Sequence, residues 1–467
     1  MKTIIPFTAI FFVVLSVSTQ RTTAQEISYM NEYRESHGSA ILYLPDNLPG
    51  VLACGGWTGE EVTASAEFMS PLSNEWVPMP DMLTPRMDFA MASILGESKV
   101  IVAGGYDGIG PLSLASTEIF DPQTNEWTPG PDLSVGRSFL RVTELANGRL
   151  LFTGGYDGNE QVAAVDLYDP YTNTMTAMAP MNFARSSHTA TSFYIDWNNT
   201  NVLVVGGFNP EFGFQMNQCE GYEVETDTWT VIAPLNTGRD NHAALRVEGL
   251  FYVTGGRVYD PVLDHFVGLA EAEIYDLDQD TWTTVSLPSA MSYHHMWYKD
   301  PPSNDDHIMV LGGANHTGIG VETTYDPPFR WELPETMTPT TGTEYENRLR
   351  SSSCSGDFVT LGSFHGIVVS GGDQNGVGTS EAWGWTVGNV PDNALPRNGL
   401  FPNPAVDRMR ITGERFERWE VIDANGKIVS AGNEWYVEVA HLAAGRYNLT
   451  IYTDGTANTY GFVKVGR

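Results

Sequence analysis

Six arginines recur at equivalent positions along the chain and have the chemistry to bind an anion. A guanidinium group offers a planar fork of hydrogen-bond donors that matches a carboxylate or a phosphate. If each arginine stands where the chain enters an inner strand, several guanidinium groups meet at one mouth of a central channel. Together they would hold a carboxylate, a phosphate or an acidic peptide. The arginines are Arg34, Arg86, Arg137, Arg185, Arg239 and Arg350, Met291 stands at a seventh position, and His37, His188, His242 and His294 follow three residues later.

The elements that position these arginines are marked by seven glycine pairs, 49 to 59 residues apart. Each pair ends a short apolar run such as 100–103 or 202–205, and a β-branched run that stops at glycine is typical of a buried strand. A repeat of about 50 residues is typical of a propeller blade. The pairs are Gly55-Gly56, Gly104-Gly105, Gly154-Gly155, Gly206-Gly207, Gly255-Gly256, Gly312-Gly313 and Gly371-Gly372.

A second marker repeats in phase with the first. An aromatic residue precedes a tryptophan by seven positions in several repeats, with turn-forming residues such as 121–125 between them. This spacing predicts two adjacent strands of a hairpin. In four repeats an arginine follows ten residues after the tryptophan or its replacement, at Arg86, Arg137, Arg185 and Arg239. The aromatic pairs are Phe120/Trp127, Tyr222/Trp229, Tyr275/Trp282 and, with methionine in the second place, Tyr168/Met175.

Residues 25–390 therefore resemble a kelch-repeat β-propeller. The resemblance implies an all-β fold with seven four-stranded blades. The last glycine pair is followed by only one strand, at 379–387, so we expect the segment 26–30 to supply the missing strand and close the ring. Some kelch domains grip acidic ligands with arginines at these positions. The alternative is that each arginine caps a turn and pairs with a neighbouring carboxylate.

Both ends of the chain indicate export. Residues 1–24 have a basic start, an apolar stretch at 4–17 and small residues before position 25, the pattern of a secretory signal peptide. No other run reaches the ~20 apolar residues that a transmembrane helix needs. The sequence therefore predicts a secreted or surface-anchored protein without a transmembrane span.

A linker at 391–399 leads to a separate segment, 400–467, in which short strands and an Asn-Gly turn predict a small β-sandwich. The segment resembles the type A sorting domain of the bacterial type IX secretion system. That resemblance implies contact with the secretion machinery and export across the outer membrane of a Bacteroidota-type bacterium; an ordinary ligand-binding sandwich is the alternative. The residues that carry it are Pro402, Asn403, Pro404, Gly426, Lys427, Gly445 and Tyr447, within the runs 401–404, 421–429 and 442–447.

Charge is concentrated in the propeller region. The chain has a formal net charge of −32, and residues 25–395 hold 14 basic and 49 acidic residues, a formal charge of −35. Such a surface repels nucleic acid and anionic membranes. It suits cationic partners, divalent ions or a saline environment, and we expect a soluble monomer.

Metal and thiol signals are weak. Of three cysteines, Cys54 and Cys354 fall in adjacent blades and form the one candidate disulfide, while a buried free thiol is the favoured state for each and for Cys219. Alternate carboxylates at 276–280 resemble a calcium loop but lack its glycine and distal glutamate. We favour a hairpin turn there, and no cofactor is expected, although copper and calcium stay open.

Two classes of function remain. Seven-bladed kelch propellers include copper-radical oxidases, and Tyr293-His294 resembles their tyrosine–histidine pair, but Cys354 follows that pair whereas the family's cysteine precedes it. A sialate-mutarotase-like activity has no motif in this chain. We therefore expect a binding protein that recognises a protein or a glycan, with a small-molecule enzyme in the channel mouth as the alternative. Exposed aromatics such as Trp57, Tyr106 and Tyr156 would favour recognition.

Overall fold

The computed structural model describes the backbone of residues 28–299 with short gaps at 33, 46–48, 71–74, 95–97, 197–198 and 248. Between 307 and 464 it describes strands and a few adjoining residues, and side chains are described mainly up to residue 296. Within these residues the fold is all-β, apart from one 3₁₀ turn, η1 (Pro210–Phe212). The prediction of an all-β propeller is confirmed.

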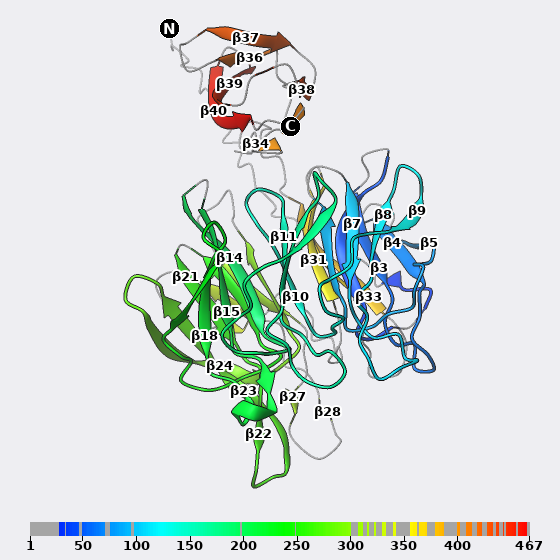
Figure 1. Ribbon diagram of the computed structural model, residues 1–467, viewed down its shortest axis with the longest axis vertical. Helices are drawn as coiled ribbons and strands as arrows, with labels where there is room; N and C mark the ends of the chain where they lie inside the picture. Colours follow the sequence, from blue (N-terminus) through cyan, green and yellow to red (C-terminus); the bar gives the residue numbers. More distant parts are fainter. Residues whose placement is uncertain are drawn as a thin grey trace, which may run out of the picture.

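Five blades are described with their side chains, each an antiparallel sheet in which consecutive strands pair from the centre outward (Figure 1). Their strands are β2 (Gly38–Tyr43), β3 (Pro49–Cys54), β4 (Ala66–Ser70) and β5 (Glu75–Met79); β6 (Ala90–Ile94), β7 (Lys99–Ala103), β8 (Thr117–Asp121) and β9 (Glu126–Pro129); β10 (Arg141–Glu144), β11 (Leu150–Thr153), β12 (Val165–Asp169) and β13 (Thr174–Ala177); β14 (Thr189–Asp196), β15 (Asn199–Val205), β18 (Cys219–Glu223) and β19 (Thr228–Ile232); and β20 (Ala243–Val247), β21 (Leu250–Thr254), β23 (His265–Asp276) and β24 (Thr281–Met291).

Two further sheets continue the series. One joins β25 (His295–Lys299), β26 (His307–Leu311), β29 (Phe329–Glu332) and β30 (Thr340–Thr341). The other joins β31 (Ser355–Leu361), β32 (Phe364–Ser370) and β33 (Thr379–Thr386) to β1 (Ser28–Tyr29). Ser28 pairs with Ser380 and Tyr29 with Thr379, so the start of the described chain supplies a strand to the last sheet of the propeller region.

Additional strands lie in the loops and in the C-terminal segment. The fifth blade carries β22 (Arg257–Asp260), which pairs with the first part of β23 and forms a long hairpin. The small ladders are β16 (Phe208–Asn209) with β17 (Phe214–Gln215) and β27 (Asn315–His316) with β28 (Glu322–Thr323). The C-terminal sheets are β34 (Gly399–Phe401), β35 (Arg408–Thr412) and β38 (Tyr436–Glu438), and β36 (Arg418–Ile422), β37 (Ile428–Gly432), β39 (Gly445–Thr453) and β40 (Thr456–Lys464).

The hydrophobic core is divided into layers between neighbouring blades. Leu52 and Phe68 of the first blade pack with Val100, Phe120 and Trp127 of the second, and similar clusters join each described blade to the next. Each blade therefore buries its second strand on both faces, which explains why these strands are continuous apolar runs. No single central core exists in this part of the chain.

The glycine pairs are needed because neighbouring blades meet at them. In the fourth blade, Gly206 and Gly207 have φ of +58° and +107°. A Cβ on Gly206 would lie 2.6 Å from the backbone oxygen of Arg239 and 2.9 Å from Cε1 of His242, both at the entry to the fifth blade. The amide of Gly207 donates to that same Arg239 oxygen at 2.9 Å. The pair is therefore a contact between blades as well as the end of a strand.

The tryptophans of the outer strands fasten each blade to the one before it. The indole nitrogens of Trp127, Trp229 and Trp282 donate to the carbonyl oxygens of Pro80, Ala179 and Ala233 at 2.8–2.9 Å. Each acceptor lies just after the outer strand of the preceding blade. In the third blade Met175 replaces the tryptophan and has no donor to make this bond.

Several predictions fall outside the described residues. These are the signal peptide at 1–24, residues 391–398 of the linker predicted at 391–399, and the residues Arg350, Cys354, Pro402, Asn403, Pro404 and Gly426. Cys54 and Cys219 are described, and both are buried free thiols. Burial raises the pKa of each thiol to about 12, so both stay protonated at neutral pH.

Candidate functional site

The five described arginines of the repeat lie inside the blades. Their side chains have no exposed surface. Each guanidinium group pairs with a buried carboxylate on the third strand of its own blade. The pairs are Arg34–Glu67 at 2.8 Å, Arg86–Glu118 at 2.6 Å, Arg137–Asp166 at 2.8 Å, Arg185–Glu220 at 2.8 Å and Arg239–Glu273 at 2.7 Å.

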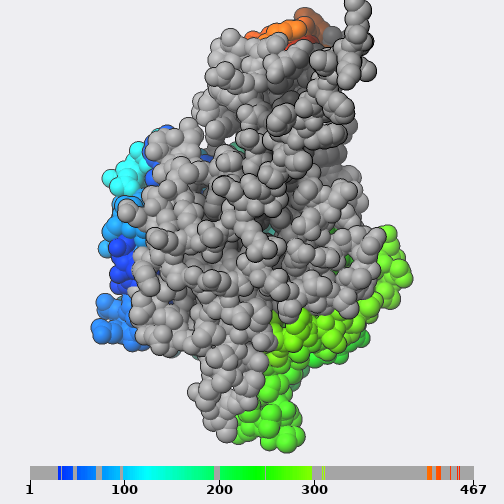
Figure 2. Space-filling view, turned by 180° about the vertical axis from the view of Figure 1, so that it is seen from behind, coloured from blue at the N-terminus to red at the C-terminus, as the bar shows by residue number. Residues whose placement is uncertain are grey.

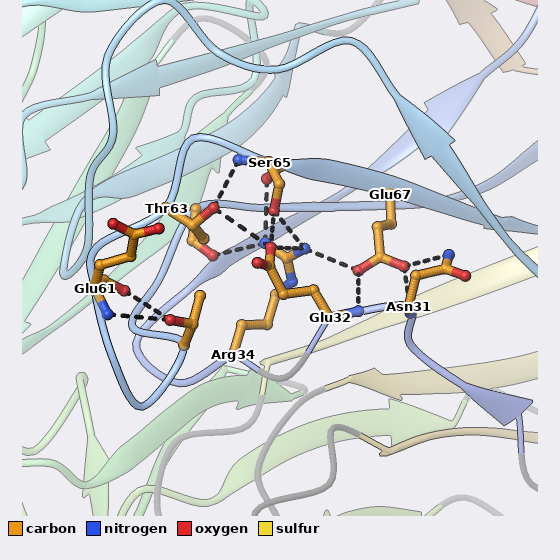
Figure 3. A network of polar contacts seen from close by, with 9 residues as sticks. Asn31, Glu32, Arg34, Glu61, Thr63, Ser65 and Glu67 are labelled. Carbon is orange, nitrogen blue, oxygen red and sulfur yellow. Dashed lines mark hydrogen bonds and ion pairs between the residues drawn. The ribbon is translucent and has the colours of Figure 1, made fainter.

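Other donors of these arginines bind backbone and hydroxyl oxygens, while the Nε atoms of Arg34, Arg86 and Arg137 have no hydrogen-bond partner within the described residues. Nη1 of Arg185 donates to the oxygens of Gly206 at 2.6 Å and Gln218 at 2.8 Å, which links the inner-strand entry to the glycine pair and the third strand. Arg34, Arg86 and Arg239 repeat the bond to the first glycine of their own blades. Figure 3 shows the first of these networks, with Arg34 between Ser65 and Glu67.

The carboxylates also bind the loop that arrives from the preceding blade. Glu220 accepts from the backbone amides of Asn182 at 2.7 Å and Phe183 at 3.2 Å. Glu118 and Glu273 accept in the same way from consecutive amides of their loops. A buried charge is tolerated where it is paired with an opposite charge and hydrogen-bonded, as these carboxylates are. Each arginine and carboxylate pair therefore fixes the connection between two blades.

This geometry differs from the expected ring of open guanidinium groups. The five arginines do not gather at a common opening, because each is directed into its own blade, and an anion could reach one only by displacing a buried carboxylate. The arrangement agrees with the structural alternative, pairing with a neighbouring carboxylate. The sequence does contain a signal for this pairing, because an acidic residue stands two positions before the hairpin aromatics, as in Glu118/Phe120 and Glu220/Tyr222.

The histidines three residues after the arginines are packing groups. His188, His242 and His294 are buried, and their Nε2 atoms contact the hydroxyl oxygens of Thr153, Thr189 and Thr254 at 2.7–2.9 Å. Burial, helped by nearby cations, lowers their pKa values, to about 3 for His294 and also for His37. These imidazoles are therefore neutral and add no positive charge. Phe89 and Leu140 take the same place against the preceding glycine pair.

A rim of backbone hydrogen bonds runs from blade to blade two residues after each arginine position. From Asp88 to Tyr293, the amide of each rim residue donates to the carbonyl of its counterpart in the preceding blade at 2.8–3.2 Å. All six have a left-handed φ between 48° and 57°. The rim residues are Ser36, Asp88, Phe139, Ser187, Asn241 and Tyr293.

Asp88 is the titratable acid of this rim. Burial raises its pKa to about 6, while a hydrogen bond from Ser36 and the charge of Arg141 act in the opposite direction. The carboxyl therefore changes its charge in mildly acidic solution rather than near pH 4.

Around the rim lies a loop face, which we define by the residue that follows each glycine pair: Trp57, Tyr106, Tyr156, Phe208 and Arg257. The first four form isolated β-bridges with Glu35, Met87, Ser138 and Ser186, and Arg257 does so with Asp240, each the residue after a repeat arginine. Trp57 is 37% exposed. The loops that start here carry the exposed apolar residues Ile109, Leu112, Phe212, Phe214, Val262 and Leu263.

Aromatic rings concentrate where the fourth and fifth blades meet on this face. We call Phe208, Phe214, Tyr259 and Phe266 the aromatic row, because successive ring centroids are 6.0, 5.4 and 5.6 Å apart. Phe212 stands beside it, in edge contact with Phe183. Figures 1 and 2 show the segment that carries β22 and β23 reaching the end of the molecule farthest from β36–β40.

Arg257 is the cation of the aromatic row. Its guanidinium carbon lies 4.2 Å from the ring centre of Phe266 and 5.3 Å from that of Tyr293, close enough for cation–π contact. Its Nε donates to the buried carboxylate of Asp240 at 2.7 Å. Asp240 also accepts from Gln215 at 3.0 Å, so one carboxylate holds the loops of both blades.

The remaining predicted residues are placed as follows. The turn at 276–280 is a hairpin turn, where Asp276 accepts from the amides of Asp278 and Gln279 and Asp280 accepts from Tyr275. No group of three metal-binding side chains was found among the described residues. In the C-terminal segment Lys427 precedes β37, and Gly445 and Tyr447 lie in β39. No helix of the described part is long and apolar enough to cross a membrane.

Comparison with known proteins identifies the class. Residues 90–134 match the family model described as Kelch motif. Kelch-like protein 35 of Mus musculus is 24% identical over 266 residues, 56% of this chain and 41% of the relative. Kelch-like protein 15 of Danio rerio is 28% identical over 230 residues, 43% of this chain and 36% of the relative. The chain therefore spans less than half the length of the curated relatives it matches.

A solved structure titled "Structure of YjhT" matches with a TM-score of 0.49 and 13% identity, over 67% of this chain and 98% of that chain. That likeness is too distant to bear on function. The strand order, the glycine pairs and the matched motif together define a kelch β-propeller. The protein is thus one that contains a kelch β-propeller with a further β-structured segment at its C-terminal end.

Proposed function

We propose that the protein is a secreted, non-catalytic binding protein that recognises another protein through the loop face of its propeller. The observation that carries this proposal is the contrast between occupied and available groups. The described repeat arginines are paired inside the blades, whereas Phe212, Phe214, Val262 and Leu263 are 41–89% exposed on the loop face. Clustered aromatic and aliphatic groups beside an arginine are typical of the centre of a protein interface.

We propose that the propeller has seven blades and that β1 closes the ring. The glycine pairs number seven, and the pairing of Ser28 with Ser380 and of Tyr29 with Thr379 supports closure. Closure by a terminal strand removes two sheet edges that would otherwise be free to pair with other chains.

We further propose that residues 1–24 direct export to the periplasm and that residues 400–467 are a type IX sorting domain, folded as a β-sandwich from the two C-terminal sheets. The protein is then released or anchored at the cell surface. Deletion of 400–467 should leave it in the periplasm, as measured by fractionation and immunoblotting. Normal appearance outside the cell would contradict this assignment.

The binding proposal is tested with the mature protein immobilised on beads and incubated with the extracellular fraction of its source culture. We expect a protein partner to be retained, and to be lost when Val262→Ser and Leu263→Ser are combined at the hairpin tip. The matched control is Val231→Ser, an aliphatic residue 54% exposed on β19. Retention that is equal in both variants would contradict binding through the loop face, and a copper-dependent oxidase activity would contradict a non-catalytic role.

A further inference from the structure

The aromatic row is built as a rigid surface rather than as a set of independent loop residues. Gln215 connects the two loops, because its Nε2 donates to Asp240 at 3.0 Å while its Oε1 accepts from the amide of Tyr259 at 2.9 Å. Asp240 in turn fixes Arg257, which stacks against Phe266. A preordered surface loses less conformational freedom on binding than flexible loops do.

Arg257 still has donors to offer. Its side chain is 21% exposed, and within the described residues only Nε has a hydrogen-bond partner, so Nη1 and Nη2 remain available. The guanidinium group has no acceptor, so its ligand must supply one. Asp240 already balances the charge of Arg257, which favours a neutral acceptor such as a backbone carbonyl over a second carboxylate.

Charge around the row decides which partner fits. Glu211 and Asp264 are exposed beside the row, and the propeller region has a formal charge of −35. The field of such a surface attracts cations and repels anions. Phe212 and Phe214 are each 41% exposed, and aromatic rings are suited to contact with apolar side chains and to cation–π contact with lysine or arginine.

We propose that the aromatic row, with Phe212 and Arg257, docks an extended apolar segment of a partner protein that carries Lys or Arg between its apolar residues. The apolar side chains cover the rings, the cations meet Glu211 and Asp264, and Arg257 donates to a backbone carbonyl of the segment. This inference rests on the proposed binding function and adds the surface and the chemistry of the partner.

The test uses the mature full-length protein and synthetic peptides of equal length. The probe alternates Lys with Leu and Phe. One control peptide replaces Leu and Phe by Ser at the same charge, and a second replaces Lys by Glu. Cellohexaose serves as an uncharged glycan.

We expect the probe to bind saturably and at least roughly tenfold tighter than either control peptide. Calorimetry measures the affinities. The double variant Phe212→Ala/Phe214→Ala should bind the probe no more tightly than the parent protein binds the control peptide with Ser in place of Leu and Phe. The variant Arg257→Gln should weaken binding of the probe roughly fivefold. Tyr171→Ala, an exposed aromatic on the hairpin of the third blade, should leave binding unchanged.

Each contrary result would overturn a different part of the proposal. Tight binding that the row variants do not alter would overturn the assignment of this surface and leave the binding function standing. Preference for the Glu peptide would overturn the partner chemistry. Binding of cellohexaose lost in the double variant would replace the protein partner by a glycan and contradict the proposed function as well. No probe binding up to about 1 mM would overturn the inference.

Discussion

Two arginines eighteen residues apart show how differently this propeller uses the same side chain. Arg239 is fully buried, and its guanidinium group binds Glu273, Glu271 and the oxygen of Gly255. Arg257 also binds a buried carboxylate, Asp240, but through Nε alone, and its side chain is 21% exposed beside the rings of Phe266 and Tyr293. The repeat therefore supplies structural arginines inside the blades, while the irregular loops supply groups that can meet a partner.

The largest effect on stability is expected from the loss of a buried arginine. Arg185→Met leaves Glu220 buried without its cation, which should cost about 3–5 kcal/mol of the free energy of unfolding. Urea unfolding followed by tryptophan fluorescence measures it. The double variant Arg185→Met/Glu220→Gln should recover part of the loss, and a single variant as stable as the parent would show that the pair is not structural.

A smaller effect is expected at the contact between blades. Gly206→Ala should destabilise the protein by about 3 kcal/mol, because a left-handed backbone is combined with a Cβ 2.6 Å from the oxygen of Arg239. Gly213→Ala is the control, since its φ is +85° but nothing lies within 4 Å of the added Cβ. That variant should lose only about 1 kcal/mol. Equal losses in thermal unfolding would argue against close contact at the glycine pair.

The indole hydrogen bond between neighbouring blades should contribute less to the free energy of unfolding. Trp229→Phe keeps an aromatic ring against Tyr222 but removes the bond from the indole nitrogen to the oxygen of Ala179, 2.9 Å long. The expected loss is about 1 kcal/mol in urea unfolding. Met175→Phe is the matched control in a blade that lacks this bond, and a comparable loss there would mean that ring packing, not the hydrogen bond, is being measured.

An effect of similar size is expected for the pH dependence of the rim. The folded pKa of Asp88, about 6, is above the value near 4 of an unfolded aspartate, so its contribution to stability is present below pH 4 and lost as the pH rises through 6. Asp88→Asn removes that loss and keeps a residue that accepts a left-handed φ. Relative to the parent, the variant should gain ~1 kcal/mol between pH 4 and pH 8, after allowing for solvent screening. A difference that does not change with pH would contradict the raised pKa.

Much of the fold could be predicted from the sequence, because its contacts repeat. Gly206-Gly207, Tyr222 and Trp229 occupy fixed positions, since each meets the same element of a neighbouring blade in the described repeats that carry that residue. The pairing of β1 with β33 agrees with the expectation that the segment 26–30 supplies a strand to the last sheet.

The site was harder to predict for a physical reason. The arginine spacing was visible, but the carboxylate that occupies each guanidinium lies some thirty residues away, as with Arg185 and Glu220. The aromatic row had no periodic signal, because Phe214 and Tyr259 lie in loop insertions of different length. Their contact depends on Gln215 and Asp240, which only the folded chain brings together.

The most direct test of the central claim is the free energy of unfolding in urea of Arg239→Gln beside that of Phe214→Ala. If the repeat arginines hold the blades while the aromatic row is free for a partner, the first variant should lose about 3–5 kcal/mol and the second less than about 1 kcal/mol. Equal stability of the two variants would contradict this division between interior and loop face.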